Sequence, residues 1–360
     1  MSTEPPIAKQ SSYRAGVGLV VERVNSYAWI LLLPAAAECT ASVWFPQVTF
    51  GGIDMQLAAL NVTGALMDGF LSAWESGRAV ANGPVGRALE FLADDVRGSF
   101  LSTYTSWAGM VGFAAALAHE QQSLFAGVLY TGACVASGFV AHGLGNALAV
   151  GIFSDPPASD AVGLAARSFR GGTTHNALLG AIMAYIAYTY LLVSTGLEDF
   201  EGSDQIDIRD DGRLLPALIA FLDSPSNRLL VAMSFSVMGA ATGNAVGNLV
   251  DEVLANPSAT IPRGTLVCNS LFAALSLSLQ AATLHCTKWQ RSVLLTSFAG
   301  SFCGAASAFA GHTSDTRRLY RSLGLAAALT NVLANLALSA LPFVVALELE
   351  RLMSKLSCIS

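Results

Sequence analysis

Apolar runs of about 20 residues recur along the chain, separated by short polar segments. Each run is long enough to cross roughly 30 Å of hydrocarbon as a helix that rises about 1.5 Å per residue. Because lipid cannot hydrogen-bond backbone groups and a helix satisfies its own, the runs predict an all-α integral membrane protein. They predict nine spans, at residues 27–46, 55–74, 99–118, 123–151, 175–197, 228–250, 264–284, 293–311 and 321–348. A run at 214–222 is too short to span and predicts an interfacial or partly buried helix before the sixth span.

The first four spans and the last four carry polar residues in the same order. The second span of each set holds an Asn in an apolar helix, Asn61 and Asn269. The third span of each set holds small and hydroxyl residues followed by aromatics. The fourth spans carry polar pairs at i, i+4, which share one helix face; these pairs are His142 with Asn146, and Asn331 with Asn335.

A single span, 175–197, separates the two sets. Four spans return the chain to its starting side, so an odd connector makes the second set begin on the opposite side. The sequence therefore predicts two inverted four-helix repeats, the architecture of many transport paths. The predicted organisation is an N-terminal segment 1–26, a first unit 27–151, a linker 152–213 with the single span and an acidic loop, a second unit 214–350 and a tail 351–360.

The charged residues add an orientation. With the N-terminus inside, the inner segments hold 12 of the 19 Lys and Arg residues, so the positive-inside rule favours a cytoplasmic N-terminus and an outer C-terminus. The acidic loop 198–211, which carries much of the net charge of −6, then faces outward. The chain start lacks the apolar core of a secretory signal, so the first span is expected to act as the insertion signal. We expect a multi-pass protein of the plasma membrane.

Composition narrows the function classes. The chain is 53% hydrophobic and 12% charged, against roughly 25% charged in a typical soluble domain. Nothing in its charge balance indicates nucleic acid as a partner. Its six Cys include no C-x-x-C pair and its five His are scattered, so buried free thiols are favoured over disulfides or metal sites. The spans show no nucleophile, base or metal constellation, which argues against an enzyme.

Residues 102–107, STYTSW, place hydroxyls and an indole in a segment otherwise apolar enough to lie in a membrane. Lipid cannot hydrogen-bond these groups, so they must face protein, water or a permeating species. The second set has a weaker counterpart at 307–312, SAFAGH. A helix that breaks here would expose backbone groups, which is tolerated along an ion path. Close helix packing through Gly and Ser is the alternative.

Asn61 and Asn269 also have two interpretations. A buried amide between spans can simply hold two helices together through a hydrogen bond, which typically stabilises the fold by about 0.6 kcal/mol. Its NH2 group can also donate to an anion without carrying a charge, so that the ion is held weakly enough to leave. The recurrence of the Asn at one place in both sets favours the transport path.

The charged residues near the predicted spans each have more than one possible role. Asp68 would repel an anion, so we interpret it as a helix-end, vestibule or ion-paired residue. Arg317, Arg318 and Arg321 follow the eighth span and are most simply inner anchors. A role in gathering anions at a channel mouth is the alternative for these arginines.

Two motifs resemble the small fluoride channels. Residues 264–269, GTLVCN, resemble the G-T-L-x-x-N signature of the second helix in that family, and 102–107 resembles the T-T-F-S-S-W stretch at the break in the third helix. Bacterial members are four-span proteins that pair antiparallel, and the eukaryotic fluoride exporters fuse two such units through an extra span. The nine-span count is similar to the fused form, which implies a monomer built of two fused units.

The resemblance implies passive, fluoride-selective conduction across the bilayer that protects the cell from fluoride. By position, Asn61 and Asn269 match the second-helix pore amides, Tyr104 and Phe309 the first aromatic after the break, and Trp107 the second. The pore residues that the resemblance implies are Asn61, Asn269, Thr103, Tyr104, Thr105, Trp107, Ser307 and Phe309. The family also holds a structural sodium (Na+) on backbone carbonyls, and Ser99 and Gly304 are the nearest equivalents here.

The chain departs from the family pattern in both sets. Residues 307–312 lose most hydroxyls and the second aromatic, Tyr104 replaces a Phe, and the G-T-L before Asn61 is absent. The first-helix Arg of the family has no match in 238–250. These departures leave the sodium site open and predict that the two pathways have diverged.

Two other functions remain open at this point. A gradient-coupled small-anion carrier can also be built from inverted repeats, and it would use a titratable mid-membrane acid, for which Asp68 is the one candidate in the first unit. A non-transporting membrane assembly subunit is the third possibility.

Overall fold

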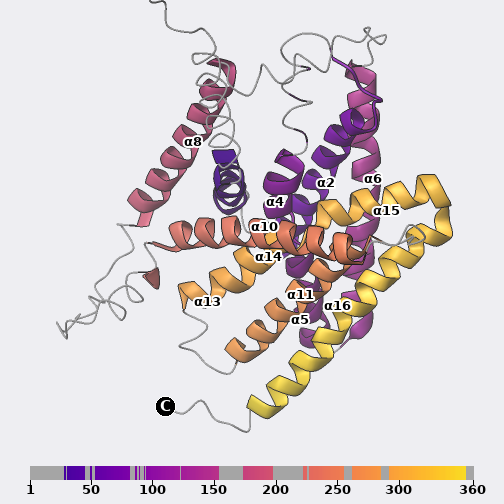
Figure 1. The fold of residues 1–360 in the computed structure, drawn as a ribbon. Coiled ribbons are helices and arrows are strands. Elements are labelled where there is room, and N and C mark those ends of the chain that lie inside the picture. Colours follow the sequence, from indigo (N-terminus) through magenta and orange to yellow (C-terminus); the bar gives the residue numbers. More distant parts are fainter. Residues whose placement is uncertain are drawn as a thin grey trace, which may run out of the picture.

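In its described residues, the computed structural model is helical apart from turns and a short antiparallel ladder, in which β1 (Thr49–Phe50) pairs with β2 (Ile53–Asp54) (Figure 1). The interfacial helix predicted at 214–222 lies almost wholly outside the described residues. These are residues 28–29, 31–44, 49–50, 53–81, 86, 89, 93, 95–121, 123–153, 173–197, 222–224, 227–254, 262–284 and 292–353.

Before the linker, the described residues form helices in the following order. An apolar helix, Leu31–Val43, ends in the π-helical turn η1 (Thr40–Trp44). It is followed by α2 (Met55–Glu75), by an interrupted helix and by α6 (Leu124–Phe153). The interrupted helix consists of η2 (Val96–Leu101), α4 (Ser102–Tyr104) and α5 (Trp107–Glu120).

The second half follows the same order after the linker helix α8 (Thr173–Leu197). Two continuous helices, α10 (Arg228–Val253) and α11 (Arg263–Leu284), precede a second interrupted helix, and α16 (Leu325–Met353) comes last. The second interrupted helix consists of α13 (Val293–Ser297), η5 (Phe298–Phe302), α14 (Cys303–Ala306) and α15 (Phe309–Leu323).

Helices occur at all nine predicted positions, and the eighth differs most from its predicted range. The apolar run predicts an end at residue 311, whereas the helix continues to Leu323. The extra turns remain helical although they are polar, because side chains such as His312 and Thr313 are buried inside the protein. Gly324, with φ of +88°, ends the helix in a conformation that favours glycine.

Three helices of the described chain are long and apolar enough to span a membrane, as expected of a membrane protein. The apolar parts of α8 and α16, Ala177–Leu192 and Leu325–Ser339, are shorter. The helices that meet the criterion are Leu124–Phe153, Arg228–Val253 and Val293–Leu323.

Small residues let the helix backbones approach closely. A Cβ added to Gly69 of α2 would lie 1.9 Å from the carbonyl oxygen of His142, and one added to Gly145 of α6 would lie 1.9 Å from that of Leu66. The two helices α2 and α6 therefore pack backbone to backbone, as small residues permit between membrane helices. In the second half, α11 packs along α16.

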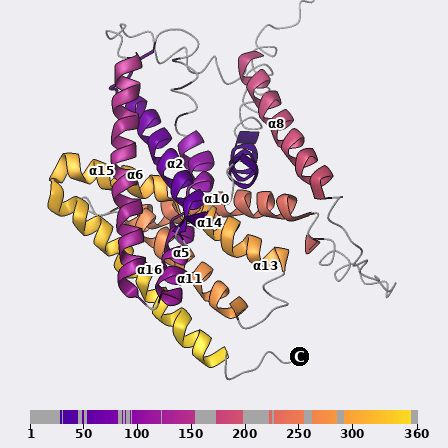
Figure 2. The same cartoon turned by 180° about the vertical axis from the view of Figure 1, so that it is seen from behind.

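The linker helix α8 lies at the edge of the molecule in both views (Figures 1 and 2). Its Tyr185 hydroxyl lies 2.9 Å from Thr40 Oγ1, and its apolar side packs near Cys39 and Met233. The centre of the molecule is instead formed where the two interrupted helices meet, because Trp107 and Phe309 belong to the largest buried cluster.

Candidate functional site

The two interrupted helices break in the same way. Each passes from a π-helical turn into a short α-helix and then into extended backbone before the helix resumes. At the first break Thr105 has φ −111° and ψ 146°, and at the second Ser307 has φ −116° and ψ 107°. The helices resume at Trp107 and Phe309. Both predicted hydroxyl stretches are therefore sites where helical hydrogen bonding is interrupted.

The breaks meet and exchange hydrogen bonds reciprocally. Thr105 Oγ1 accepts from the Ala310 amide at 3.1 Å, and Ser307 Oγ accepts from the Ala108 amide at 2.9 Å. The Ser307 carbonyl also accepts from the Trp107 amide at 3.2 Å. Each hydroxyl thus caps the helix that resumes after the other break, which satisfies amides that a helix start leaves unpaired. We call this arrangement the crossing.

The side chain of Asn61 hydrogen-bonds the backbone amide and carbonyl of Ser106 at the first break. Its Nδ2 donates to the Ser106 carbonyl at 3.3 Å, and its Oδ1 accepts from the Ser106 amide at 2.9 Å. The side chain is fully buried. Both ends of the amide are therefore engaged with the backbone, which is the helix-tying role that the sequence left open.

The aromatic residues have a different correspondence from the one predicted. Because the helices resume at Trp107 and Phe309, these two residues occupy matching positions, and Tyr104 precedes its break. The Trp107 and Phe309 rings stack with centroids 6.4 Å apart. Tyr104 instead stacks on Phe100 at 5.5 Å, and its hydroxyl lies 3.2 Å from Thr63 Oγ1 on α2. Measured from the helix breaks, Phe309 therefore corresponds in position to Trp107 and not, as expected, to Tyr104.

Asn269 has no backbone partner like that of Asn61. Its Nδ2 donates to Asn335 Oδ1 at 3.3 Å, and Asn335 Nδ2 in turn contacts the Asn331 carbonyl at 3.0 Å. Asn331 Nδ2 donates to Thr316 Oγ1 at 2.9 Å, and that hydroxyl lies 3.5 Å from His312 Nε2. These contacts form one buried chain of uncharged polar groups, which we call the polar seam: Asn269, Asn335, Asn331, Thr316 and His312.

The polar seam reaches the crossing and has unsatisfied atoms at both ends. The His312 ring lies 4.5 Å from that of Trp107, whose Nε1 donates to Ser339 Oγ at 2.8 Å. Asn269 Oδ1 and His312 Nδ1 are buried without a hydrogen-bond partner in the described structure. Buried polar atoms usually have partners, so an orphan at each end of the seam indicates places for water or a ligand. Thr103 Oγ1 is a further orphan of this kind beside the first break.

A polar cavity of about 170 Å³ adjoins Asn269. It lies between α10, α11 and the helices that lead to the crossing, and it is lined by Ser102, Asn244, Thr265 and Asp251 among others. Asp251 Oδ1 accepts from the Gly264 amide at 2.8 Å, so the carboxylate caps the start of α11. The lining of the cavity thus combines amide and hydroxyl groups with the negative charge of Asp251.

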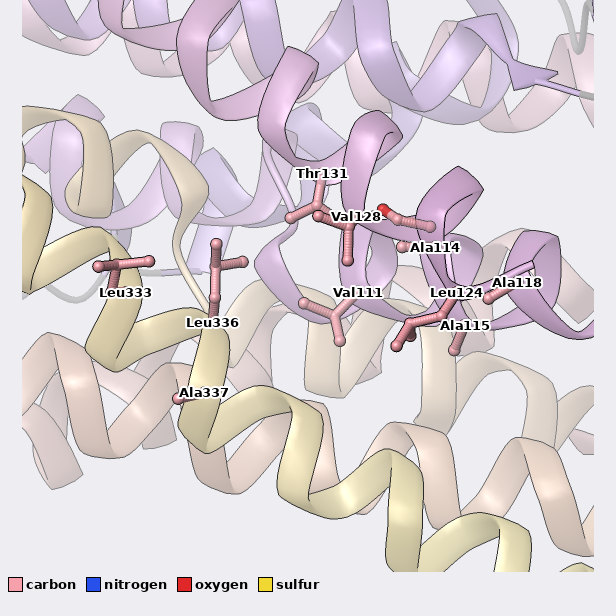
Figure 3. Close-up of a pocket in the computed structure, with 11 residues that line it drawn as sticks. Val111, Ala114, Ala115, Ala118, Leu124, Val128, Thr131, Leu333, Leu336 and Ala337 are labelled. Carbon is pink, nitrogen blue, oxygen red and sulfur yellow. Dashed lines mark hydrogen bonds between the residues drawn. The ribbon is translucent and has the colours of Figure 1, made fainter.

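A larger, apolar cavity of about 360 Å³ lies between α5, the start of α6 and α16 (Figure 3). Its lining is aliphatic except for Thr131, whose hydroxyl donates to the Gly127 carbonyl at 2.9 Å within α6. It therefore has no free polar group to orient an ion, and the candidate site does not include it.

The carbonyls predicted to hold sodium are engaged in local hydrogen bonds. Ser99 O accepts from Ser102 Oγ at 3.0 Å, and Gly304 O accepts from the Ser307 amide at 3.2 Å. Gly304 lies against Ser106, since a Cβ there would be 3.1 Å from Ser106 Oγ. Both carbonyls therefore already accept local hydrogen bonds, and a sodium ion held by them stays a prediction.

Asp68 is ion-paired, one of the three roles left open for it. Its Oδ1 accepts from Arg97 Nε at 2.6 Å, and its Oδ2 lies 3.2 Å from His142 Nε2. Arg97 also pairs with Glu75 and donates to Ser314 Oγ on α15 at 2.9 Å. Charged groups therefore occupy the interior beside α2 and α6. The polar seam beside α11 and α16 instead consists of uncharged groups and the titratable His312.

Sequence reasoning missed one acid, Glu38. It lies in the first apolar helix, and its Oε2 accepts from Ser236 Oγ at 2.6 Å, while Oε1 accepts from Ser301 Oγ at 3.2 Å. A single carboxylate inside an apolar run was the available signal. Glu38 and Asp68 are thus both acids within apolar helices of the first half of the chain.

No protein-family model, curated protein or solved structure matches this chain. In the described part of the chain, no group of three or more His, Cys, Asp or Glu side chains is placed to hold a metal ion. The site is therefore characterised by the crossing, the polar seam and the polar cavity alone.

Proposed function

We propose that this protein is a passive fluoride channel that exports fluoride and protects the cell from its toxicity. The observation that carries the proposal is the crossing, where two helices break at matched hydroxyl residues deep in the protein. Broken helices are tolerated within a membrane where they line an ion path. The choice of fluoride among anions rests on the GTLVCN and STYTSW motifs.

In this proposal the ion follows the polar cavity to Asn269 and then the polar seam toward the crossing. Amide and hydroxyl groups donate hydrogen bonds to an anion without a fixed charge, so binding is weak enough for release. The Asn61 side of the molecule is less suited to conduction, because Asn61 is engaged with Ser106 and because Asp68 and Arg97 are engaged with each other.

The proposed membrane arrangement has nine spans, two inverted four-helix units and a cytoplasmic N-terminus in the plasma membrane. The common order of helices in the two halves supports it, as does the reciprocity of the contacts at the crossing. The chain then acts as a monomer, because both halves of the crossing come from one polypeptide. A structural sodium at the breaks remains a prediction from the family resemblance.

The test is fluoride efflux from liposomes that contain the purified protein, with proton and sodium gradients collapsed. A passive channel releases fluoride under its own gradient and releases chloride far more slowly. The absence of protein-dependent fluoride release in well-folded preparations would reject the proposal.

A second candidate is a gradient-coupled small-anion carrier, which Glu38 favours. Its carboxylate accepts hydrogen bonds from hydroxyls of α10 and η5. A mid-membrane acid held this way can exchange a proton during transport. Fluoride flux that requires a proton gradient and disappears in Glu38→Gln would favour the carrier, whereas unchanged gradient-free flux in Glu38→Gln supports the channel.

A further inference from the structure

Two arginines contact one side chain of α6, and a third arginine lies near them. Arg321 Nη2 lies 3.3 Å from Asn146 Oδ1, and Arg78 Nη1 lies 3.5 Å from the same oxygen. Arg317 lies one helical turn before Arg321 on α15, which lies across α6 (Figure 1). Arg78 repels both α15 arginines, and Arg317 repels Arg321. Like charges gathered around one neutral acceptor call for a compensating anion.

The other arginines nearby have such compensation. Arg97 pairs with Asp68 and Glu75, and Arg318 pairs with Asp315 at 3.0 Å. Among the described residues, no carboxylate lies within ion-pair distance of Arg78, Arg317 or Arg321. The three positive charges are therefore unbalanced by any described carboxylate.

Arg317 is held in place without a charged partner. Its Nη1 donates to the Phe139 carbonyl at 3.4 Å, and the guanidinium lies 5.3 Å from the centre of the Phe139 ring. Gly143 makes room for it, since a Cβ there would lie 2.3 Å from Arg317 Nη1. Its Nε is buried without a hydrogen-bond partner in the described structure. The α6 surface thus positions a guanidinium that retains an unused donor.

The surroundings of this cluster are apolar and exposed. Leu144 of α6 is 52% exposed, and Tyr320 and Leu323 of α15 are 47% and 54% exposed. Exposed apolar side chains in a membrane protein face acyl chains. Arg78, Arg317 and Arg321 also belong to segments on the predicted cytoplasmic side, where anionic lipids concentrate.

We propose that Arg78, Arg317 and Arg321 bind the phosphate of an anionic phospholipid. A guanidinium presents a planar fork of donors that suits phosphate oxygens. In this proposal the phosphate accepts hydrogen bonds from Arg78 and Arg321 in place of Asn146 Oδ1, which both arginines contact only at long distance. The exposed leucines beside the cluster contact the acyl chains. This site is separate from the polar seam, and the proposal does not depend on fluoride conduction.

The test is native mass spectrometry of the full-length protein in neutral detergent, with added phosphatidylserine or phosphatidylcholine. We expect preferential, stoichiometric retention of phosphatidylserine over phosphatidylcholine. Retention should fall about twenty-fivefold in the double variant Arg317→Gln, Arg321→Gln, because each arginine contributes about a fivefold factor. Arg78→Gln, in an exposed position outside the helices, tests the same site with little risk to folding. Arg318→Gln on the same helix is the matched control and retains binding.

Each outcome decides the proposal. Equal retention of the two lipids, or equal binding by wild type and Arg78→Gln, overturns it. Inorganic phosphate that displaces phosphatidylserine at millimolar concentration identifies a site for soluble phosphate and overturns the lipid assignment. Loss of binding in Arg318→Gln to the same degree overturns it as well, because the effect is then one of net charge.

Discussion

Asn61 and Asn269 lie at matching places in their helices, yet their amides have different partners. Asn61 bonds the backbone of the break at Ser106 with both of its polar atoms, whereas Asn269 contacts Asn335 and keeps an unsatisfied Oδ1 beside the polar cavity. At the scale of single residues, the first amide supports the fold. The second uses one of its two Nδ2 hydrogens at Asn335, and in the proposed function the other hydrogen is donated to the anion.

We predict that Asn269→Ala lowers fluoride flux roughly tenfold or more, because a hydrogen bond to a charged group contributes about 1.5–3 kcal/mol. Its thermal stability should fall by only about 1 kcal/mol. Asn61→Ala is the contrast, and its main effect is expected on folding yield. Fluoride flux and thermal unfolding, measured in the same preparations, check both variants. Equal losses of flux and stability in Asn269→Ala would show that Asn269 only holds helices together.

Asp251 gives an opposite prediction, because its carboxylate lines the polar cavity. Asp251→Asn removes the charge and keeps an oxygen that can accept from the Gly264 amide. Reduced repulsion should raise fluoride flux roughly two- to tenfold at low salt, with a smaller gain at high salt. A fall in flux would show that the cavity needs its negative charge and would favour a cation path or proton coupling.

At the scale of helices, close backbone approach holds α2 against α6. Gly145→Ala places a Cβ where the Leu66 carbonyl lies, so we expect destabilisation of about 1–3 kcal/mol or failure to fold. Gly132→Ala in the same helix is the matched control, because nothing lies within 4 Å of its added Cβ. Thermal unfolding in detergent measures both, and similar stabilities of the two variants would contradict the α2–α6 packing.

Helices were predictable from sequence where apolar runs dominate, and the breaks were predictable from hydroxyls in such runs. The contacts between the breaks were not, because Thr105 and Ala310 are far apart in the chain and only the crossing brings them together. The same reason hides the partners of Glu38, which come from α10 and η5. The eighth helix was predicted too short because buried polar residues extend it beyond the apolar run.

At the scale of the whole molecule, the nine-span arrangement predicts which residues face each side. Gln121, between the third and fourth spans, should lie outside, and Arg318, between the eighth and ninth, should lie inside. Both positions are exposed. Single cysteines there, in a background without other reactive thiols, should react with a membrane-impermeant reagent from opposite sides in intact cells and inside-out vesicles. Labelling of both from one side would contradict the inverted arrangement.

The most direct measurement of the central claim is fluoride release from liposomes that contain the wild-type protein, followed with a fluoride electrode beside matched chloride-loaded liposomes. With all other gradients collapsed, a passive fluoride channel should give rapid, protein-dependent fluoride release and little chloride release. Folded protein that releases no fluoride, or that releases both anions equally, would contradict a fluoride-selective channel.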